Sequence, residues 1–199
     1  MIPGCILSGG KGRRIGGQGK AFINLSGKPL IYHSIENIKN QVTVLSINAR
    51  NNKDYNSLDY PVILDEFNQD TDGSGPLAGI LTAINWAKSL KEDNRYVATI
   101  PVDLPFLPKD FINRMLLEIN IYKPLVAVAS SNNRLHPVTA VWSLDLADRL
   151  RIALIDGTRK IDDFTSNIDT ISVDWKYDSL DPFFNVNTPE DLSYAENVI

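Results

Sequence analysis

Short apolar runs alternate along the chain with segments in which apolar residues recur three or four positions apart. The first pattern is typical of buried strands and the second favours helices. We find no internal repeat and no low-complexity segment. The alternation therefore predicts an α/β fold: a single Rossmann-like domain, 1–199, in which helices cover both faces of a mostly parallel sheet to give three α/β/α layers.

The predicted elements follow the order that such a fold requires. Strands are expected at Ile2–Leu7, Val42–Ile47, Pro61–Leu64, Tyr96–Ile100, Leu125–Ala129, Val138–Trp142, Thr170–Val173 and Phe183–Val186. Helices are expected at Leu30–Ile38, over the apolar face of Leu77, Ile80, Leu81, Ile84 and Ala87, at Lys109–Ile119, at Leu144–Ile155, and after the capping residue Thr188.

The composition and charge narrow the class of protein. Apolar residues make up 43% of the chain and charged residues 22%, which indicates a globular fold rather than a disordered chain. A formal net charge of -4 argues against non-specific binding to nucleic acid. Because the sequence has neither a signal peptide nor an apolar run of roughly 20 residues, we expect a cytoplasmic protein without membrane contact. Cys5 lies in an apolar run and is expected to be a buried hydrophobic residue.

A glycine-rich segment directly follows the first predicted strand. From Leu7 to Lys20 the chain contains six glycines and four cations. Glycines let the backbone approach an anion and point several N–H groups at it, while lysine and arginine supply positive charge. The combination indicates a polyphosphate-binding loop, for which a flexible surface turn is the alternative.

Two common phosphate-binding motifs do not fit the spacing of this loop. The ATPase loop needs Ser or Thr after its Gly-Lys pair, but Ala21 stands there and Arg14 occupies the place of its first glycine. The dinucleotide-binding fingerprint needs a third glycine where Ile15 stands. The loop therefore belongs to neither class.

The loop instead resembles the Leu-x-Gly-Gly-x-x-x-Arg-x-Gly-x-x-x-Lys signature of nucleotidyltransferases that activate sugars and related phosphorylated compounds. Later motifs make the whole chain similar to the molybdenum cofactor guanylyltransferases, the MobA family. They are Gly-Pro-Leu-Ala-Gly at 75–79, Pro-Val-Asp-Leu-Pro-Phe at 101–106, His-Pro-Val at 136–138 and Phe-Asn-Val-Asn-Thr-Pro at 184–189. The resemblance is weakest at about 157–179. Ser8, Ile15 and Gly19 depart from common forms of the loop without removing a cation or a required glycine.

This resemblance implies the nucleotide-diphospho-sugar transferase type of fold and a set of site residues. It implies that the nucleotide is bound by Leu7, Ser8, Gly9, Gly10, Gly12, Lys20, Asn48, Asp65, Gly79 and Asp103. It also implies that the second substrate, a pterin, is bound by His136, Asn185 and Asn187. Catalysis would depend on Arg14, Lys20 and Asp103, with Asp103 as the ligand of Mg²⁺.

Most of these side chains also have a structural explanation. Asp103 could be a turn residue between prolines, but a carboxylate at the same sheet edge as a triphosphate loop favours a magnesium ligand. Asn48 could be an ordinary strand-end residue and Asp65 a helix cap. Asn185 and Asn187 lie on one side of an extended segment and could both face the site, or could serve the turn before the last helix.

Together these features predict transfer of GMP from GTP to the terminal phosphate of the molybdopterin cofactor, with release of pyrophosphate and with Mg²⁺ as cofactor. The acceptor phosphate is already ionised, so the reaction needs positioning and charge neutralisation rather than a general base. The alternatives are cytidylyl or other nucleotidyl transfer to the cofactor or to a sugar phosphate, and a non-catalytic GTP-binding module. We also expect transient contacts with cofactor-biosynthesis proteins or recipient molybdoenzymes, and no nucleic-acid partner.

Overall fold

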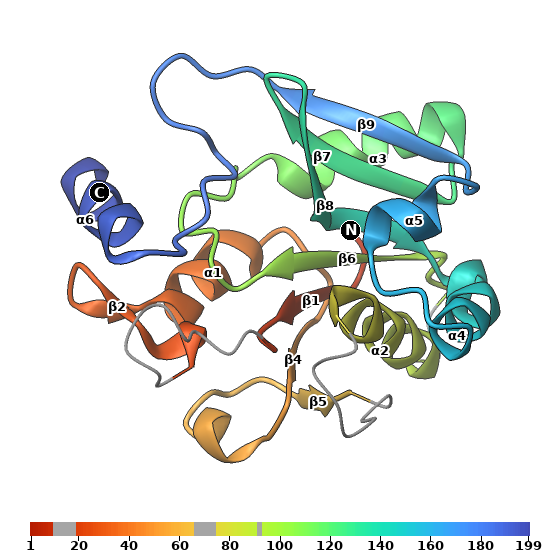
Figure 1. The fold of residues 1–199 in the computed structure, drawn as a ribbon, viewed down its shortest axis with the longest axis horizontal. Helices are drawn as coiled ribbons and strands as arrows, with labels where there is room; N and C mark the ends of the chain where they lie inside the picture. Colours follow the sequence, from red (N-terminus) through yellow and green to blue (C-terminus); the bar gives the residue numbers. More distant parts are fainter. Residues whose placement is uncertain (10–18, 66–74, 91–92) are drawn as a thin grey trace.

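The computed structural model describes residues 1–9, 19–65, 75–90 and 93–199. Within these ranges, seven strands form one sheet in the order β5-β4-β1-β6-β8-β7-β9 (Figure 1). The strands are β1 (Gly4–Leu7), β4 (Leu45–Ala49), β5 (Val62–Leu64), β6 (Tyr96–Pro101), β7 (Val126–Ser131), β8 (Arg134–Ser143) and β9 (Thr170–Trp175). A separate hairpin is formed by β2 (Asn24–Leu25) and β3 (Lys28–Pro29).

The sheet is mostly parallel, as predicted. The neighbouring strands β5, β4, β1 and β6 are parallel, and β9 is parallel to β7, whereas β8 is antiparallel to both of its neighbours. Leu7 at the end of β1 pairs with Asn48 on one side and with Pro101 on the other. The carboxyl ends of β1, β4 and β6 therefore meet at one edge, where open α/β sheets bind their ligands.

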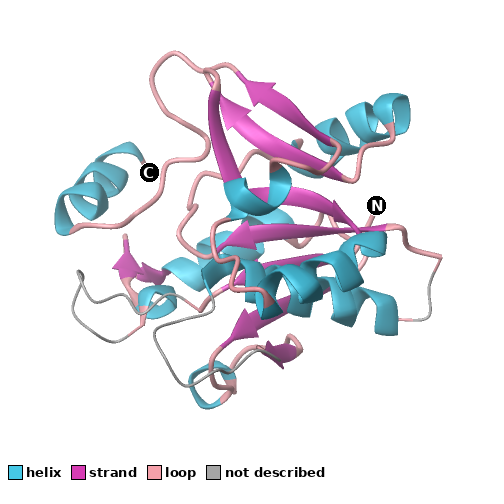
Figure 2. Ribbon diagram, turned by 45° about the vertical axis from the view of Figure 1, so that its right-hand side comes forward, coloured by secondary structure: helices cyan, strands magenta, loops and turns pink. Residues whose placement is uncertain are grey.

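Helices cover both faces of the sheet (Figure 2). The core on one face includes α1 (Leu30–Ile38) and α3 (Phe111–Tyr122), and the core on the other includes α2 (Gly75–Ser89), α4 (Ala147–Ile155) and α5 (Ile161–Thr165). The last helix, α6 (Pro189–Val198), packs against the β2–β3 hairpin. Short 3-10 helices occur at Lys20–Phe22, Lys53–Tyr55 and Leu144–Leu146.

Strand β1 shows how the sequence pattern separates the two cores. Its side chains alternate, so Ile6 packs in the core with α1 while Cys5 and Leu7 pack in the core with α2. Cys5 is fully buried, and burial raises the pKa of its thiol to about 12. The thiol therefore stays protonated near neutral pH, and the prediction of a buried hydrophobic residue is confirmed.

Several predicted boundaries are wrong. The strand expected at Val42–Ile47 lies at Leu45–Ala49, and the strand expected at Val138–Trp142 extends back to Arg134. The segment Phe183–Val186 is not a strand, because its apolar side chains pack in the core without a strand ladder. The β2–β3 hairpin and α5 were not predicted, since both are too short to show a period.

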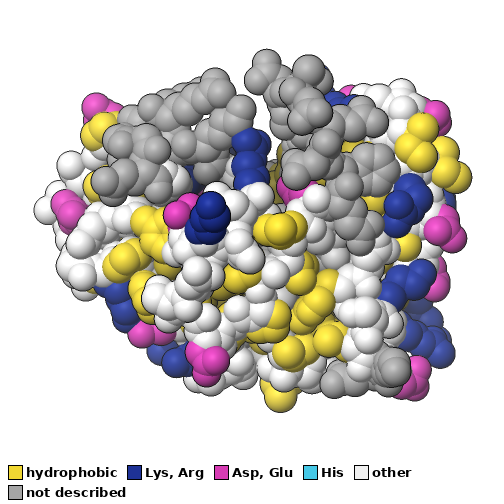
Figure 3. All heavy atoms as spheres, turned by 90° about the horizontal axis from the view of Figure 1, so that it is seen from below, with side chains coloured by type: hydrophobic (Ala, Val, Ile, Leu, Met, Phe, Trp, Pro, Cys, Tyr) yellow, Lys and Arg dark blue, Asp and Glu magenta, His cyan; other side chains and the backbone are white. Residues whose placement is uncertain are grey.

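The distribution of charge on the surface and the length of the helices are relevant to binding of nucleic acid and membranes. On the face shown in Figure 3, lysine and arginine side chains are interspersed with acidic ones and form no continuous basic patch among the described residues. Among the residues that the structure describes, no helix is both long enough and apolar enough to cross a membrane.

Candidate active site

Two cavities open beyond the carboxyl ends of the central strands. The first has a volume of about 420 Å³ and the second about 250 Å³. Pro101, Asp103 and Val138 line both cavities. Two adjoining compartments of this size with a shared carboxylate could hold two substrates side by side.

The first cavity collects most of the residues predicted to bind the nucleotide. They are Leu7, Gly9, Lys20, Asn48, Asp65, Gly79 and Asp103. Ser8 is not among them, because its hydroxyl oxygen lies 2.6 Å from the hydroxyl oxygen of buried Tyr55. The predicted residues Gly10, Gly12 and Arg14 lie outside the described ranges.

Lys20 and Asp103 form the charged centre of the site. Asp103 comes two residues after β6 ends and is buried. The Lys20 amine donates to Asp103 Oδ2 and, at 2.6 Å, to Asn187 Oδ1. Asn185 donates from Nδ2 to Asp103 Oδ1 at 2.9 Å. Both carboxylate oxygens therefore accept hydrogen bonds, and residues from three distant segments meet at this point.

The chemistry of these groups fits a magnesium ion that is bound together with phosphates. Among the residues that the structure describes, no group of three or more His, Cys, Asp or Glu side chains could hold a metal. Magnesium commonly takes one or two carboxylates and completes its shell with substrate phosphates and water. Asp103 is a hard oxygen ligand of that kind, and it lines a cavity of about 420 Å³. It could therefore contribute one ligand to a magnesium–nucleotide complex.

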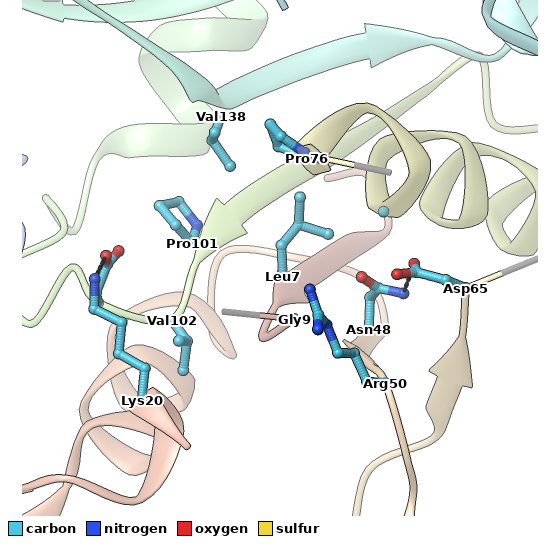
Figure 4. Close-up of a pocket in the computed structure, with 13 residues that line it drawn as sticks. Leu7, Gly9, Lys20, Asn48, Arg50, Asp65, Pro76, Pro101, Val102 and Val138 are labelled. Carbon is cyan, nitrogen blue, oxygen red and sulfur yellow. Dashed lines mark hydrogen bonds and ion pairs between the residues drawn. The ribbon is translucent and has the colours of Figure 1, made fainter. Parts of the chain in front are cut away.

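Asn48 and Asp65 form the other end of the first cavity (Figure 4). Asn48 donates from Nδ2 to Asp65 Oδ1 at 2.8 Å and to the Ile63 carbonyl oxygen at 3.3 Å. A Cβ atom on Gly79 would come within 2.7 Å of Asn48 Oδ1. The glycine in α2 thus allows the Asn48 side chain to approach the helix closely. In the figure this pair lies on the opposite side of the cavity from Lys20.

Arg50 lines the same cavity and was not predicted from the sequence. It is exposed, follows β4 directly, and lies between the Asn48–Asp65 pair and Lys20 in Figure 4. A cation at this position can interact with the phosphates or the base of a bound nucleotide. Its place next to the end of a parallel strand was the signal that could have identified it.

The second cavity contains two of the three residues predicted to bind the second substrate, His136 and Asn185. His136 is buried, its Nε2 atom lies 2.6 Å from the hydroxyl oxygen of Ser131, and its ring lies 4.9 Å from that of Phe183. Burial lowers the pKa of His136 below its usual value, which favours a neutral ring at physiological pH. The third residue, Asn187, does not line this cavity and contacts Lys20 instead.

Comparison with known sequences identifies a family model and many relatives. Residues 4–170 match the model of the MobA-like NTP transferase domain. A molybdenum cofactor guanylyltransferase from Rhodopseudomonas palustris (strain HaA2) is 37% identical over 98% of this chain and 91% of that protein. One from Shewanella woodyi is 40% identical over 95% of this chain and 92% of that protein.

Solved structures agree with this result. The crystal structure of molybdopterin-guanine dinucleotide biosynthesis protein A from Archaeoglobus fulgidus has a TM-score of 0.78 and 25% sequence identity, covering 99% of this chain and 98% of that chain. A CMP:2-keto-3-deoxy-manno-octonic acid synthetase structure with CTP has a TM-score of 0.71 at 11% identity, covering 100% and 97%. The second likeness shows only that the fold is shared, and the fold is of the nucleotide-diphospho-sugar transferase type, as predicted.

Proposed function

This chain belongs to the MobA-like NTP transferase family, and from that premise we propose that it transfers GMP from GTP to the terminal phosphate of molybdopterin. It is a nucleotidyltransferase, as the match over residues 4–170 and the full-length relatives indicate. The choice of GTP and molybdopterin rests on relatives that are named molybdenum cofactor guanylyltransferases.

The observation that carries the proposal is the meeting of the two cavities at Asp103. The first cavity is large enough for a nucleotide, and the second adjoins it along Pro101, Asp103 and Val138. A donor phosphate in the first cavity and an acceptor phosphate in the second would approach each other next to the Lys20–Asp103 pair. This is the proximity that direct transfer between two phosphates requires.

The proposed reaction forms one bond and breaks one. An oxygen of the acceptor phosphate attacks the α-phosphorus of GTP, the bond between that phosphorus and the bridging oxygen of the β-phosphate breaks, and pyrophosphate leaves with the electron pair. Lys20 places its positive charge where negative charge accumulates, and Asn187 orients the Lys20 amine. The Asn48 and Asp65 side chains offer hydrogen-bond acceptors and donors to the nucleoside.

Magnesium is part of the proposal. Asp103 is the residue that would hold it, and the ion would neutralise charge on the phosphates of the donor. Asn185 donates to Asp103 Oδ1 and so fixes the direction in which the carboxylate points. The loop residue Arg14, which lies outside the described ranges, is proposed to add a further positive charge.

The proposal is tested by mixing the protein and Mg²⁺ with molybdopterin and each of the four nucleoside triphosphates in turn. Pyrophosphate release and the mass of the product are measured together. We expect pyrophosphate and a guanine dinucleotide product with GTP alone. A matched reaction without molybdopterin measures hydrolysis of GTP by water.

Each other result changes a different part of the proposal. Product with CTP or another nucleotide would keep the chemistry and overturn the choice of GTP. If no pyrophosphate were released with any of the four nucleotides, although the pterin was intact and the protein folded, molybdopterin would be overturned as the acceptor. Activity that persists after all divalent metal has been removed with EDTA would overturn the role of magnesium.

A further inference from the structure

The wall of the second cavity contains a cation at the first position of β8. Arg134 follows a tight turn in which Asn132 and Asn133 have φ angles of 44° and 69°. Two consecutive residues with positive φ are typical of a two-residue hairpin turn. Asp174 Oδ1 accepts hydrogen bonds from the Asn133 amide at 3.0 Å and from Ser130 Oγ at 2.9 Å, and so ties the turn to β9. The backbone that carries Arg134 is therefore well fixed.

No described residue that lines the second cavity pairs with the Arg134 guanidinium. Arg134 is exposed, and although its backbone belongs to the β7–β8 ladder, its guanidinium makes no hydrogen bond or ion pair with any residue in the described ranges. Of the described residues that line the second cavity, it is the only lysine or arginine and Asp103 the only acid. Asp103 already pairs with Lys20 from the first cavity. Because His136 has a lowered pKa and contacts Ser131, the histidine adds no positive charge.

A guanidinium group with free donors at the mouth of a small cavity is suited to a phosphate. Arginine can donate two parallel N–H bonds to two phosphate oxygens, and such charge-assisted bonds are about twice as strong as neutral ones. The second cavity also provides Asn185, whose amide already donates to Asp103. The described residues of this cavity thus combine one unpaired guanidinium with polar and apolar neighbours.

We propose that Arg134 binds the phosphomonoester of the acceptor and holds it in the second cavity facing Asp103. This inference rests on the proposed function, and it adds an acceptor-binding residue that takes no part in binding GTP. The β7–β8 hairpin then recognises the acceptor, while the strand ends of β1 and β4 recognise the donor. The chemistry that Arg134 selects is a dianionic phosphate on the attacking molecule.

The kinetic test uses the variant Arg134→Met, which removes the charge and keeps a long apolar side chain. The matched control is Arg95→Met: Arg95 is exposed and precedes β6 at the end of the strand opposite to the site. For Arg134→Met we expect the KM for molybdopterin to rise by about 10- to 100-fold, as for loss of one charge-assisted contact. The kcat and the KM for GTP should stay within about twofold, as should all constants of the control. An unchanged KM for molybdopterin, or an equal rise in the KM for GTP, would overturn the proposal.

A binding test separates this inference from the proposed function. Inorganic phosphate is titrated into the protein saturated with Mg²⁺ and a non-hydrolysable GTP analogue, and binding is followed by NMR of the protein amides. We expect saturable shifts near 131–136 in the natural protein and in Arg95→Met, and their loss in Arg134→Met. Equal phosphate binding by all three proteins, or none by the natural protein, would overturn the anion site. Phosphate binding through Arg134 in a protein that transfers no GMP would overturn only the proposed function.

Discussion

The Asp103 carboxylate is held from two sides. Lys20 donates to Oδ2 and Asn185 donates to Oδ1, so the rotamer of the carboxylate is set before any substrate binds. A group positioned in this way loses little conformational entropy when it takes up a metal or a phosphate-bound ion.

The replacement Asp103→Asn tests the proposal that Asp103 is a magnesium ligand, because it changes a single atom. The amide has nearly the same shape, so we expect the far-UV circular dichroism to stay unchanged, while GMP transfer falls by about 100-fold or more because the negative oxygen is lost. Initial rates at saturating GTP, molybdopterin and Mg²⁺ provide the measurement. Asp59→Asn is the control, since Asp59 is exposed and lines neither cavity. Transfer at the natural rate by Asp103→Asn would contradict the metal assignment.

Gly79 is a second position where the addition of one carbon atom is expected to change the affinity for GTP. A methyl group there would come within 2.7 Å of Asn48 Oδ1, so Gly79→Ala should displace the Asn48 amide from Asp65. We expect about a tenfold loss of GTP affinity, the equivalent of one hydrogen bond, by titration calorimetry. The helix itself should tolerate alanine, which has the higher helix propensity.

A double-mutant cycle tests whether this loss passes through Asn48. In an Asn48→Ala background, Gly79→Ala should cause no further loss of GTP affinity, because the displaced amide is absent. Equal losses in both backgrounds, or full GTP affinity in Gly79→Ala, would show that the contact with Asn48 does not matter for the nucleotide.

The sequence predicted the residues of the site that belong to recognisable motifs. Lys20 and Asp103 were predicted because a phosphate loop and a strand-end aspartate both fall at the carboxyl edge of a parallel sheet, and the structure brings them together. Arg50 and Arg134 were missed. Exposed arginines are common: Arg50 could have been identified only by its place directly after a parallel strand, and Arg134 is distinguished only by the second cavity that it lines. Whether the predicted residues perform their expected roles stays a prediction until the variants are measured.

At the scale of elements, β8 has an irregular region beside the site. Val128 and Ala129 are consecutive on β7, but their pairing partners on β8, Ala140 and His136, are four positions apart. The three residues between them leave the ladder, and one is Pro137, which has no N–H to donate. Such irregularities often redirect side chains next to active sites. Here the region places Val138 in the wall that both cavities share.

Thr99 on β6 stabilises this irregular region. Its hydroxyl donates to the Val138 carbonyl oxygen at 2.7 Å and accepts from Trp142 Nε1 at 2.9 Å. Thr99→Val should therefore lower the free energy of unfolding by about 1–3 kcal/mol for each buried group left unsatisfied. Because the cavity wall would shift, we also expect a higher KM for molybdopterin. Urea denaturation and steady-state kinetics give the two measurements.

Trp142→Phe is the matched control for Thr99→Val. It removes the indole donor and keeps the bond from Thr99 to Val138, so it should lower stability through the lost bond and volume without raising the KM for molybdopterin. If both variants raised that KM equally, the effect would come from general loosening of the core and the positioning role of Thr99 would be wrong.

The elements also show which parts of the fold a sequence pattern can predict. Helix α1 was predicted with the observed ends, because Leu30, Ile31, Ile35 and Ile38 repeat at helical spacing and all are buried. Phe183–Val186 was wrongly predicted as a strand, since an apolar run marks burial but not hydrogen bonding. The Val186 amide donates to the Asp103 carbonyl oxygen, and Phe183 packs on the rings of Trp175 and His136. Tertiary contacts of this kind cannot be read from periodicity.

At the scale of the whole molecule, the Lys20 amine joins three parts of the chain. It lies in the segment before β2, contacts Asp103 after β6, and contacts Asn187 directly before the cap of α6. The cap itself is well formed, with Thr188 and Asp191 in a reciprocal capping box. A ligand that draws Lys20 away from Asp103 therefore acts on the loop after β6 and on the C-terminal segment at once.

Lys20 and the proposed magnesium ion would compete for the Asp103 carboxylate, and this competition predicts how metal and nucleotide binding are coupled. In the free protein the Lys20 amine occupies Asp103 Oδ2, whereas nucleotide phosphates would offer the amine another partner. We therefore expect Lys20→Met to increase the affinity of the nucleotide-free protein for Mn²⁺, measured by EPR as a probe of the magnesium site, by about tenfold, while GMP transfer falls sharply. Lys28→Met, which breaks a surface pair with Glu36, should change neither quantity. An unchanged Mn²⁺ affinity in Lys20→Met would mean that Lys20 does not compete with the metal for Asp103, and that Mg²⁺ and GTP bind without coupling through this residue.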